Sequence, residues 1–153
     1  AALKTKAPIM CHMEAGADCI ETADFFLQRG IPSKKIIMCH LDRTEPLIQK
    51  HWKLAQGGVW LEYDTIARPK YHDIGYEIEL IRGIWERGLE NKLLLSLDTT
   101  RNRLESYGGS PGLSYILREF VPMLQASNIC DSKTIVQTLM INNPSRALNI
   151  RDD

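Results

Sequence analysis

The sequence lacks the features that mark several large protein classes. Its 153 residues carry 19 basic and 19 acidic side chains, so no charge excess favours nucleic acid or an anionic membrane surface. No apolar run approaches the roughly 20 residues of a membrane span, and residues 1–6 lack the apolar stretch of a signal peptide. A starting Met is also absent, so we expect that residue 1 is not the natural start. These absences predict a chain with neither nucleic-acid nor membrane partners.

Cysteine is sparse as well. Cys11, Cys19, Cys39 and Cys130 follow no paired spacing, which predicts free thiols in a reducing cytoplasm. Cys11 and Cys39 each precede a histidine at the end of an apolar run. Because side chains alternate along a strand, we expect both thiols to point away from that histidine and to pack in the core.

What the sequence does contain is a repeated pattern: four short apolar runs, each leading into a side chain that can bind metal or move protons. The runs and the residues that follow them are 8–11 with His12, 36–39 with His40, 59–63 with Asp64 and 93–97 with Asp98. The four polar residues are 28, 24 and 34 residues apart, and each interval holds one helix-length pattern. Repeated strand–helix units of this size are typical of a (β/α) barrel, whose active site lies where the strands end.

Apolar residues at helical spacing predict the connecting helices and their buried faces. The expected buried stripes are Ala17, Ile20, Ala23, Phe26 and Leu27; Leu47, Ile48, Trp52, Leu54 and Ala55; Ile74, Ile78, Ile81 and Trp85; Leu113, Ile116, Leu117, Phe120 and Leu124; and Ile135, Val136, Leu139 and Met140. We expect Thr44 to cap the second helix, with Pro46 in its first turn. His51 falls within that helix and is expected at the surface.

The predicted fold class is therefore α/β, with a parallel sheet covered by helices. A complete barrel of this kind takes about 250 residues, so residues 1–153 suffice for half, as a single partial barrel domain. Four parallel strands leave two unpaired edges, which are a liability. We expect the half-barrel to be completed by another chain, by a missing segment or by a copy of itself as a homodimer.

His12, His40 and Asp98 are the candidate metal ligands. Two histidines at adjacent strand ends can bind one metal ion through neutral imidazole nitrogens. Asp98 can add a carboxylate and help to orient a metal-bound water. A lone histidine is more often structural, but two in parallel contexts, together with a strand-end aspartate, favour a metal site. This mixture of ligands suits zinc, manganese, iron or cobalt.

Five short motifs are similar to those of a known family: MCHLD at 38–42, LSLD at 95–98, NNPSR at 142–146, DTI at 64–66 and YGG at 107–109. The first three resemble the second half of the phosphotriesterase family, in the amidohydrolase superfamily. The last two are similar to its lactonase-like and phosphotriesterase-homology branch. The resemblance covers essentially the whole chain, from barrel strand five to the C-terminus, and so implies strands five to eight of a (β/α)8 TIM barrel.

The resemblance implies a two-metal hydrolase that cleaves a small-molecule ester, lactone or phosphoester. In such an enzyme His12 and His40 would bind one metal, while Asp98 would bind the other and act as the catalytic residue. The metals, for which we expect zinc at two per complete barrel, lower the pKa of the bridging water and polarise the substrate oxygen. Asp98 can then accept or relay the proton released during attack. The family's His-x-His pair and bridging carboxylated lysine have no counterpart in this chain.

Four further residues are weaker candidates, each with two interpretations. Asp42 could orient a ligand or relay protons, or could be a solvated loop carboxylate. Asp64 could shape the substrate pocket or cap the following turn. Arg68 and Tyr71 could contact a substrate carbonyl or carboxylate, or could belong to an ordinary exposed loop.

Two hypotheses of different class follow for the chain. It is either part of a phosphotriesterase-like metal hydrolase, or a non-catalytic half-barrel with an incomplete metal site that self-associates or packs on a partner. The intact motifs favour the hydrolase for the parent protein. The missing ligands favour the scaffold for the isolated chain.

Overall fold

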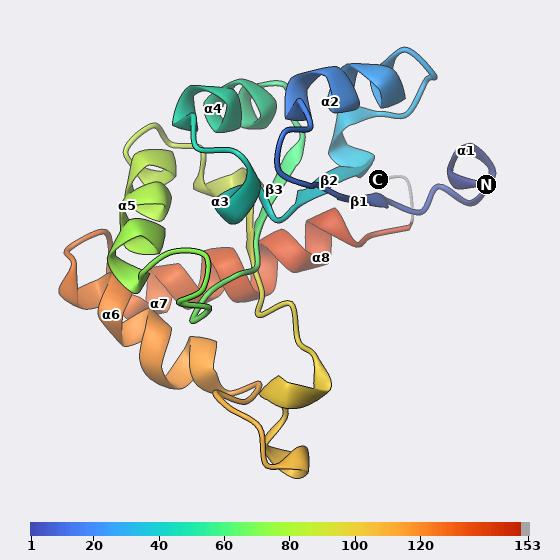
Figure 1. The fold of residues 1–153 in the computed structure, drawn as a ribbon. Helices are drawn as coiled ribbons and strands as arrows, with labels where there is room; N and C mark the ends of the chain where they lie inside the picture. The colour runs from blue at the N-terminus through green and yellow to red at the C-terminus, as the bar shows by residue number, and fades with distance from the viewer. Residues whose placement is uncertain (151–153) are drawn as a thin grey trace.

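The computed structural model describes residues 1–150, and its centre is a four-stranded parallel sheet (Figure 1). The strands are β1 Ile9–His12, β2 Ile36–Cys39, β3 Trp60–Tyr63 and β4 Leu93–Leu95. They lie in the order β1-β2-β3-β4, so neighbours in sequence are neighbours in the sheet. Because all three strand pairs are parallel, the carboxyl ends of the four strands lie at the same edge, where the predicted polar residues follow.

Helical segments connect the strands. The α-helices are α1 Ala2–Thr5, α2 Cys19–Leu27, α3 Leu41–Thr44, α4 Ile48–Gln56, α5 Ile74–Trp85, α6 Val121–Ala126, α7 Ser132–Ile135 and α8 Asn143–Ala147. Short 3-10 helices lie at Ser33–Lys35, Glu90–Lys92, Arg101–Arg103 and Glu105–Tyr107, and π-helical turns at Ile116–Phe120 and Val136–Asn142. The expected stripe of Ile74, Ile78, Ile81 and Trp85 lies on one helix, α5, with Ile81 in the main core cluster and the other three packed against it. Asp131 caps α7, and its side chain accepts a hydrogen bond from the Thr134 backbone N–H.

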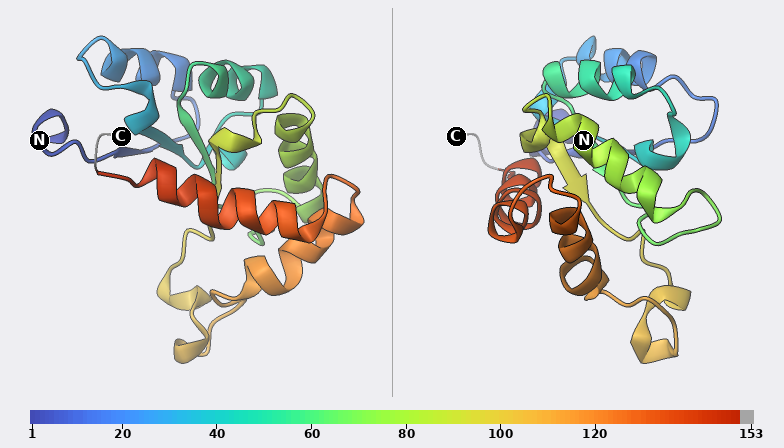
Figure 2. Two further views of the ribbon diagram at one scale, coloured as in Figure 1. Left: turned by 180° about the vertical axis from the view of Figure 1, so that it is seen from behind. Right: turned by 90° about the vertical axis from the view of Figure 1, so that its left-hand side faces the viewer.

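The helices cover the sheet, with α2, α4 and α5 on one side and the C-terminal helical stretch running beside β4 (Figure 2). Ile36, Met38 and Leu61 belong to the main core cluster together with apolar residues of these helices. Their strand neighbours Ile37 and Trp60 belong to a second, smaller cluster. Because side chains alternate along a strand, the two clusters lie on opposite faces of the sheet.

The start of the second long helix differs from the prediction. His40 adopts a left-handed backbone, φ 64°, and the short helix α3 begins directly after it. Thr44 therefore ends α3 instead of capping the next helix, and α4 begins only at Ile48. Leu47 precedes α4 and is 54% exposed, so its assignment to the buried stripe is wrong.

The buried stripes of two other helices are also partly wrong. Ala17 precedes α2, and Leu27 at its end is exposed. Leu113 precedes the fourth helical segment and Leu117 is exposed, whereas Ile116 and Phe120 are buried. The π-helical turn at Ile116–Phe120 has a longer period than an α-helix, which takes Leu117 off the packed face.

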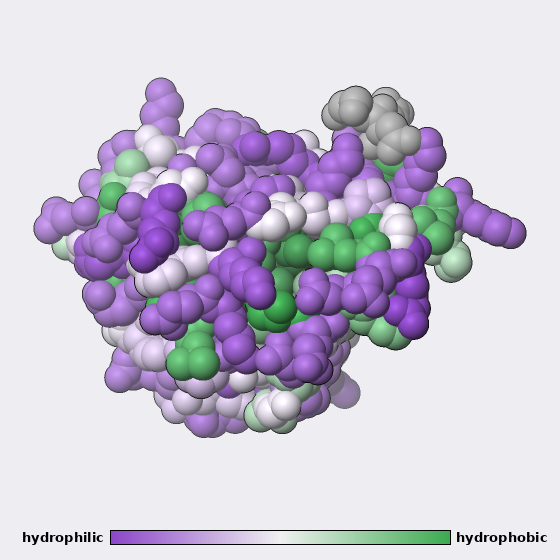
Figure 3. Space-filling view, turned by 90° about the horizontal axis from the view of Figure 1, so that it is seen from above, coloured by the Kyte–Doolittle hydropathy of each residue, from purple (hydrophilic) through white to green (hydrophobic). Residues whose placement is uncertain are grey.

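The face of the molecule seen in Figure 3 is mostly hydrophilic. Figure 3 shows apolar side chains gathered between hydrophilic ones on the face formed by α2 and α4. A shallow pocket of about 130 Å³ lies between these two helices, and Ile20, Leu27 and Leu54 are among its lining residues. Within residues 1–150, no helix combines the length and apolarity needed to span a membrane.

Candidate metal centre

His12 and His40 meet at the carboxyl edge of the sheet. His12 is the last residue of β1 and pairs in register with Cys39, the last residue of β2. The left-handed backbone at His40 then turns its ring toward β1 instead of to the opposite face. As a result His12 Nδ1 lies 2.8 Å from His40 Nε2, with the two ring planes near perpendicular at 78°.

This geometry also changes the expected position of Cys39. Its register partner is His12, so both side chains lie on the same face of the sheet. Cys39 was expected to point away from His40, but the strand alternation behind that expectation does not extend to His40, which leaves the strand conformation. Cys39 is nevertheless buried in the smaller core cluster, and burial raises the pKa of its thiol far above the ordinary value.

Asp64, the residue after β3, holds His40 in place. Its Oδ1 lies 2.6 Å from His40 Nδ1, and its Oδ2 accepts a hydrogen bond of 3.1 Å from the His40 backbone N–H. Both residues are buried. A carboxylate on one imidazole nitrogen fixes the tautomer and leaves the other nitrogen free for a metal. The sequence predicts a place for Asp64 in the substrate pocket or as a turn cap, but it carries no signal for this contact with His40.

The electrostatics of the pair favour a neutral imidazole. Burial lowers the pKa of His40, and the nearby charges of Arg43 and His12 lower it further. Burial raises the pKa of Asp64 to about 8, with the charges of Asp42 and Glu62 adding to the effect. A neutral imidazole is the form that binds metals, so the environment of His40 suits a ligand.

Glu14 orients the His12 ring through Nε2, the ring nitrogen that does not face His40. This Nε2 lies 2.6 Å from Glu14 Oε1, and this hydrogen bond is the main reason that the pKa of Glu14 is lowered. Both side chains are exposed, in contrast to the buried Asp64–His40 pair. The two nitrogens that remain, His12 Nδ1 and His40 Nε2, face each other and form the nucleus of a candidate metal centre.

The structure pairs Asp98 with Arg68. The Arg68 guanidinium lies 3.0 Å from Asp98 Oδ2 and also donates to the Asp98 backbone carbonyl. Asp98 has a left-handed backbone, φ 41°, three residues beyond the end of β4. Within the described part of the chain, no set of three possible ligand atoms lying within 4.8 Å of one another includes Asp98. Its role as a metal ligand stays a prediction, as do those of both histidines.

The other weaker candidates are distributed around this centre. Asp42 is buried, and its Oδ2 accepts hydrogen bonds from the Thr65 backbone N–H and hydroxyl at 2.6 and 2.5 Å. Its interpretation as a solvated loop carboxylate is therefore wrong. Tyr71 is 39% exposed and stacks with the cations of Arg43 and Lys70. Its contact with a substrate stays a prediction.

The predicted surface position of His51 is wrong. The side chain is fully buried, with Nδ1 2.5 Å from the Tyr63 hydroxyl and Nε2 2.9 Å from the Glu45 carbonyl. Burial lowers its pKa. The residue is therefore a neutral core histidine, because these two buried groups satisfy both ring nitrogens.

Several known proteins are similar to this chain in sequence. A sequence model of the phosphotriesterase family matches residues 1–148. The chain is similar to the phosphotriesterase homology protein of Escherichia coli (strain K12), 27% identical over 143 residues, which are 94% of this chain and 48% of the relative. It is also similar to a phospho-furanose lactonase of Mycoplasmopsis synoviae (strain 53), 29% identical over 94% of this chain and 42% of that protein.

A solved structure shows the same likeness. The crystal structure of a lactonase from Listeria monocytogenes superimposes with a TM-score of 0.90 at 30% identity, over 99% of this chain and 47% of that one. The chain thus spans about half the length of the proteins that it matches, which are TIM barrels. The predicted α/β half of a (β/α)8 barrel is confirmed.

Proposed function

Because this chain belongs to the phosphotriesterase family, we propose that it supplies one half of the active site of a metal-dependent hydrolase. The observation that carries the proposal is the convergence of His12 Nδ1 and His40 Nε2, with Asp64 on the opposite nitrogen of His40. Imidazole pairs held by a carboxylate are typical of catalytic metal sites. In this proposal His12, His40 and Asp98 hold divalent metal, with zinc the expected ion.

The side chains at the strand ends fit a divalent metal ion. The two facing ring nitrogens are soft enough for zinc and lie at the strand ends, where barrel enzymes keep their active sites. When bound, the metal would polarise the carbonyl or phosphoryl oxygen of the substrate and activate water for attack. Asp64 would keep the His40 ring from rotating, so that Nε2 stays directed at His12.

Asp98 and Arg68 are the groups that we assign to proton transfer and positioning. The Asp98 carboxylate is 37% exposed, which leaves it accessible to accept the proton released when water attacks. The Arg68 guanidinium is only 12% exposed and holds this carboxylate by an ion pair and a backbone contact. Arg103 joins the loop after Asp98 to the loop after β3, because it donates to the carbonyls of Ile66 and Ala67.

The substrate class that we propose is a small ester, lactone or phosphoester. Two named relatives are lactonases, and a solved structure of the Escherichia coli relative holds phosphate in its active site. The sparse, unpaired cysteines support a cytoplasmic location.

The test is an Asp98→Asn variant of the full-length protein, assayed on a panel of lactones and phosphoesters. We expect hydrolysis to fall by at least about 100-fold, because Asn neither accepts the proton nor carries the charge. Asp24→Asn, an exposed position on α2, is the matched control and should keep full activity. Elemental analysis of both variants measures the metal content. Wild-type activity in Asp98→Asn would refute the assignment.

A non-catalytic half-barrel is the second candidate function. It is favoured by the edge strand β1, where Met10 is 55% exposed on the face that carries His12. Such an edge would be covered by a second copy or a complementing chain. Metal-free protein that sediments as a dimer of the 17.4 kDa chain and hydrolyses nothing would support this candidate.

A further inference from the structure

A second cluster of ligand-type side chains lies away from the His12–His40 pair. Asp42 of α3, His72 of the loop before α5 and Glu77 of α5 each offer one atom within 4.8 Å of the others. Glu77 is fully buried and Asp42 is 2% exposed. We propose that these three residues form a second divalent-cation site, on the side of the sheet covered by α4 and α5.

Three oxygens of the buried carboxylates have no hydrogen bond. Within residues 1–150, neither Oε1 nor Oε2 of Glu77 accepts a hydrogen bond, and Asp42 Oδ1 also accepts none. The nearest hydroxyl on β3, that of Tyr63, is already held by His51. Buried carboxylate oxygens are nearly always hydrogen-bonded, paired with a charge or bound to metal. Three buried oxygens without a hydrogen bond in one place therefore point to a cation between them.

The orientation of His72 supports the same conclusion. Its Nδ1 lies 3.1 Å from the Asp73 backbone carbonyl, which can only accept, so Nδ1 carries a proton. Its Nε2 faces Glu77 Oε2 at 3.3 Å and Asp42 Oδ2 at 3.9 Å. Thr65 Oγ1 lies 3.1 Å from Nε2, but its single proton is donated to Asp42. Nε2 of His72 carries no proton in this tautomer and faces three acceptor oxygens, so it needs a proton or a metal ion. Metal-binding histidines usually donate their other ring N–H to a backbone carbonyl or a carboxylate, as Nδ1 of His72 does here.

The site has an entry path. A pocket of about 230 Å³ reaches Asp42 and His72 from solvent, and Arg43, Tyr71 and Tyr76 also line it. Two carboxylates and one imidazole carry a net charge that a divalent ion neutralises, and they suit Zn²⁺, Mn²⁺ or Co²⁺. The pocket leaves room for water as a further ligand.

The position of the site gives the cation a structural role. Asp42 accepts the backbone N–H of Thr65, the residue after the Asp64 that holds His40. A cation that fixes Asp42 would therefore fix the turn that carries Asp64. Without a cation, burial and the charge of Asp42 raise the pKa of Glu77 to about 9, so a proton occupies the same place. Cation and proton are alternatives at Glu77.

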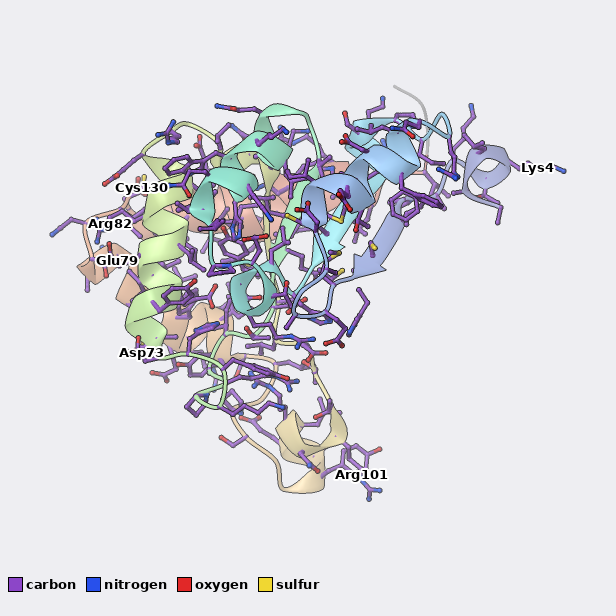
Figure 4. The ribbon with its side chains drawn as sticks, turned by 45° about the horizontal axis from the view of Figure 1, so that its top comes forward. Lys4, Asp73, Glu79, Arg82, Arg101 and Cys130 are labelled. Atoms are coloured by element: carbon purple, nitrogen blue, oxygen red, sulfur yellow. The ribbon has the colours of Figure 1, made fainter. Side chains whose placement is uncertain are left out.

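The experiment is a Co²⁺ titration of the full chain, followed by visible absorption and by equilibrium dialysis. The His12→Ala/His40→Ala double variant removes the first candidate centre, and we expect it to retain one Co²⁺ per chain. Adding Glu77→Gln should weaken this binding at least tenfold. Glu79→Gln is the matched control, because Glu79 is exposed, pairs with Arg82 and points outward from α5 in Figure 4.

A second comparison covers the possibility that the double variant does not fold. Glu77→Gln and Glu79→Gln are made in the otherwise unchanged chain, where Gln preserves the side-chain volume. Glu77→Gln should then bind one Co²⁺ fewer than Glu79→Gln. Equal binding by these two variants would overturn the proposal, as would a folded double variant that takes up no Co²⁺. Neither result would bear on hydrolysis, so this proposal and the proposed function fail separately.

Discussion

At the scale of single residues, the contact between Asp64 and His40 matters most for the candidate metal centre. A carboxylate that accepts from Nδ1–H makes the opposite nitrogen a better ligand and holds the ring in place. The pair is buried, so water cannot substitute for the lost carboxylate. Asp64 therefore acts on the metal centre through His40.

We predict that Asp64→Asn lowers the metal affinity of the His12–His40 centre by about 10- to 100-fold. Asparagine keeps the size of the side chain but has no ionised form, so it cannot supply the negative charge that makes His40 a stronger ligand. Competition with a chromogenic chelator measures the affinity, and Asp24→Asn on the exposed face of α2 is the control. An unchanged affinity would show that Asp64 serves only the local fold.

His51 shows how a single residue can escape a prediction from sequence. The apolar pattern of α4 placed it among solvent-facing positions, yet it connects Tyr63 of β3 with the Glu45 carbonyl. These two partners lie far apart in the pattern and become neighbours only when α4 packs on the sheet. Periodicity alone contains no information about such a tertiary hydrogen bond.

We predict that His51→Leu destabilises the fold by about 1–3 kcal/mol, because it leaves a buried hydroxyl and a buried carbonyl without a partner. Gln49→Leu, at an exposed position of the same helix, should change the free energy of unfolding by less than about 0.5 kcal/mol. Urea unfolding followed by circular dichroism measures both. Equal effects of the two variants would contradict the hydrogen-bonding role.

At the scale of secondary-structure elements, the sequence predicts the strands well and some helix starts poorly. Short apolar runs followed by a polar residue gave all four strands and their parallel order, because burial on both faces leaves a clear pattern. The left-handed backbone at His40 has no counterpart in the apolar pattern of the sequence. Because of it, α3 begins directly after His40, α4 begins later than predicted, and the His40 ring contacts His12.

The residues of the candidate site that end strands could be predicted from the sequence, but their tertiary contacts could not. His12 and His40 were found because they end their strands, and the sheet order makes those ends adjacent. Asp64 was placed correctly at a strand end, but its partner depends on the turn at His40. The sequence did not indicate Glu77, which falls within the first turn of α5 and is buried only in the folded chain, close to Asp42.

The N-terminus of α5 supplies a prediction at this scale. Asp73 caps the helix, and its Oδ1 accepts a 2.8 Å hydrogen bond from the Tyr76 backbone N–H (Figure 4). We predict that Asp73→Ala costs about 1 kcal/mol of stability, as expected for loss of an N-cap. Glu79→Ala, on the exposed side of the same helix, is the control for chemical denaturation. No difference between the two variants would mean that the cap contributes nothing.

At the scale of the whole molecule, the stability of the chain should depend on pH through Glu77. Its carboxyl has a pKa of about 9 in the folded state, because burial and the charge of Asp42 disfavour ionisation. In the unfolded chain the value returns to the ordinary one near 4.5. The folded state therefore binds the proton more tightly. The stabilisation of the folded state by this proton is complete below about pH 4.5 and is lost as the pH rises toward 9.

We predict that, with a chelator present, the free energy of unfolding falls between pH 5 and pH 9 by an amount on the order of a few kcal/mol. Asp64, whose pKa is raised to about 8, contributes in the same direction. Glu77→Gln removes the ionisation of one group only, so its curve should be flatter while the contribution of Asp64 persists. Urea titrations at several pH values measure the slopes. Parallel curves for the two proteins would show that Glu77 ionises freely in the folded state.

Added Co²⁺ should flatten the wild-type curve if it replaces the Glu77 proton, because the folded state then no longer gains from binding that proton.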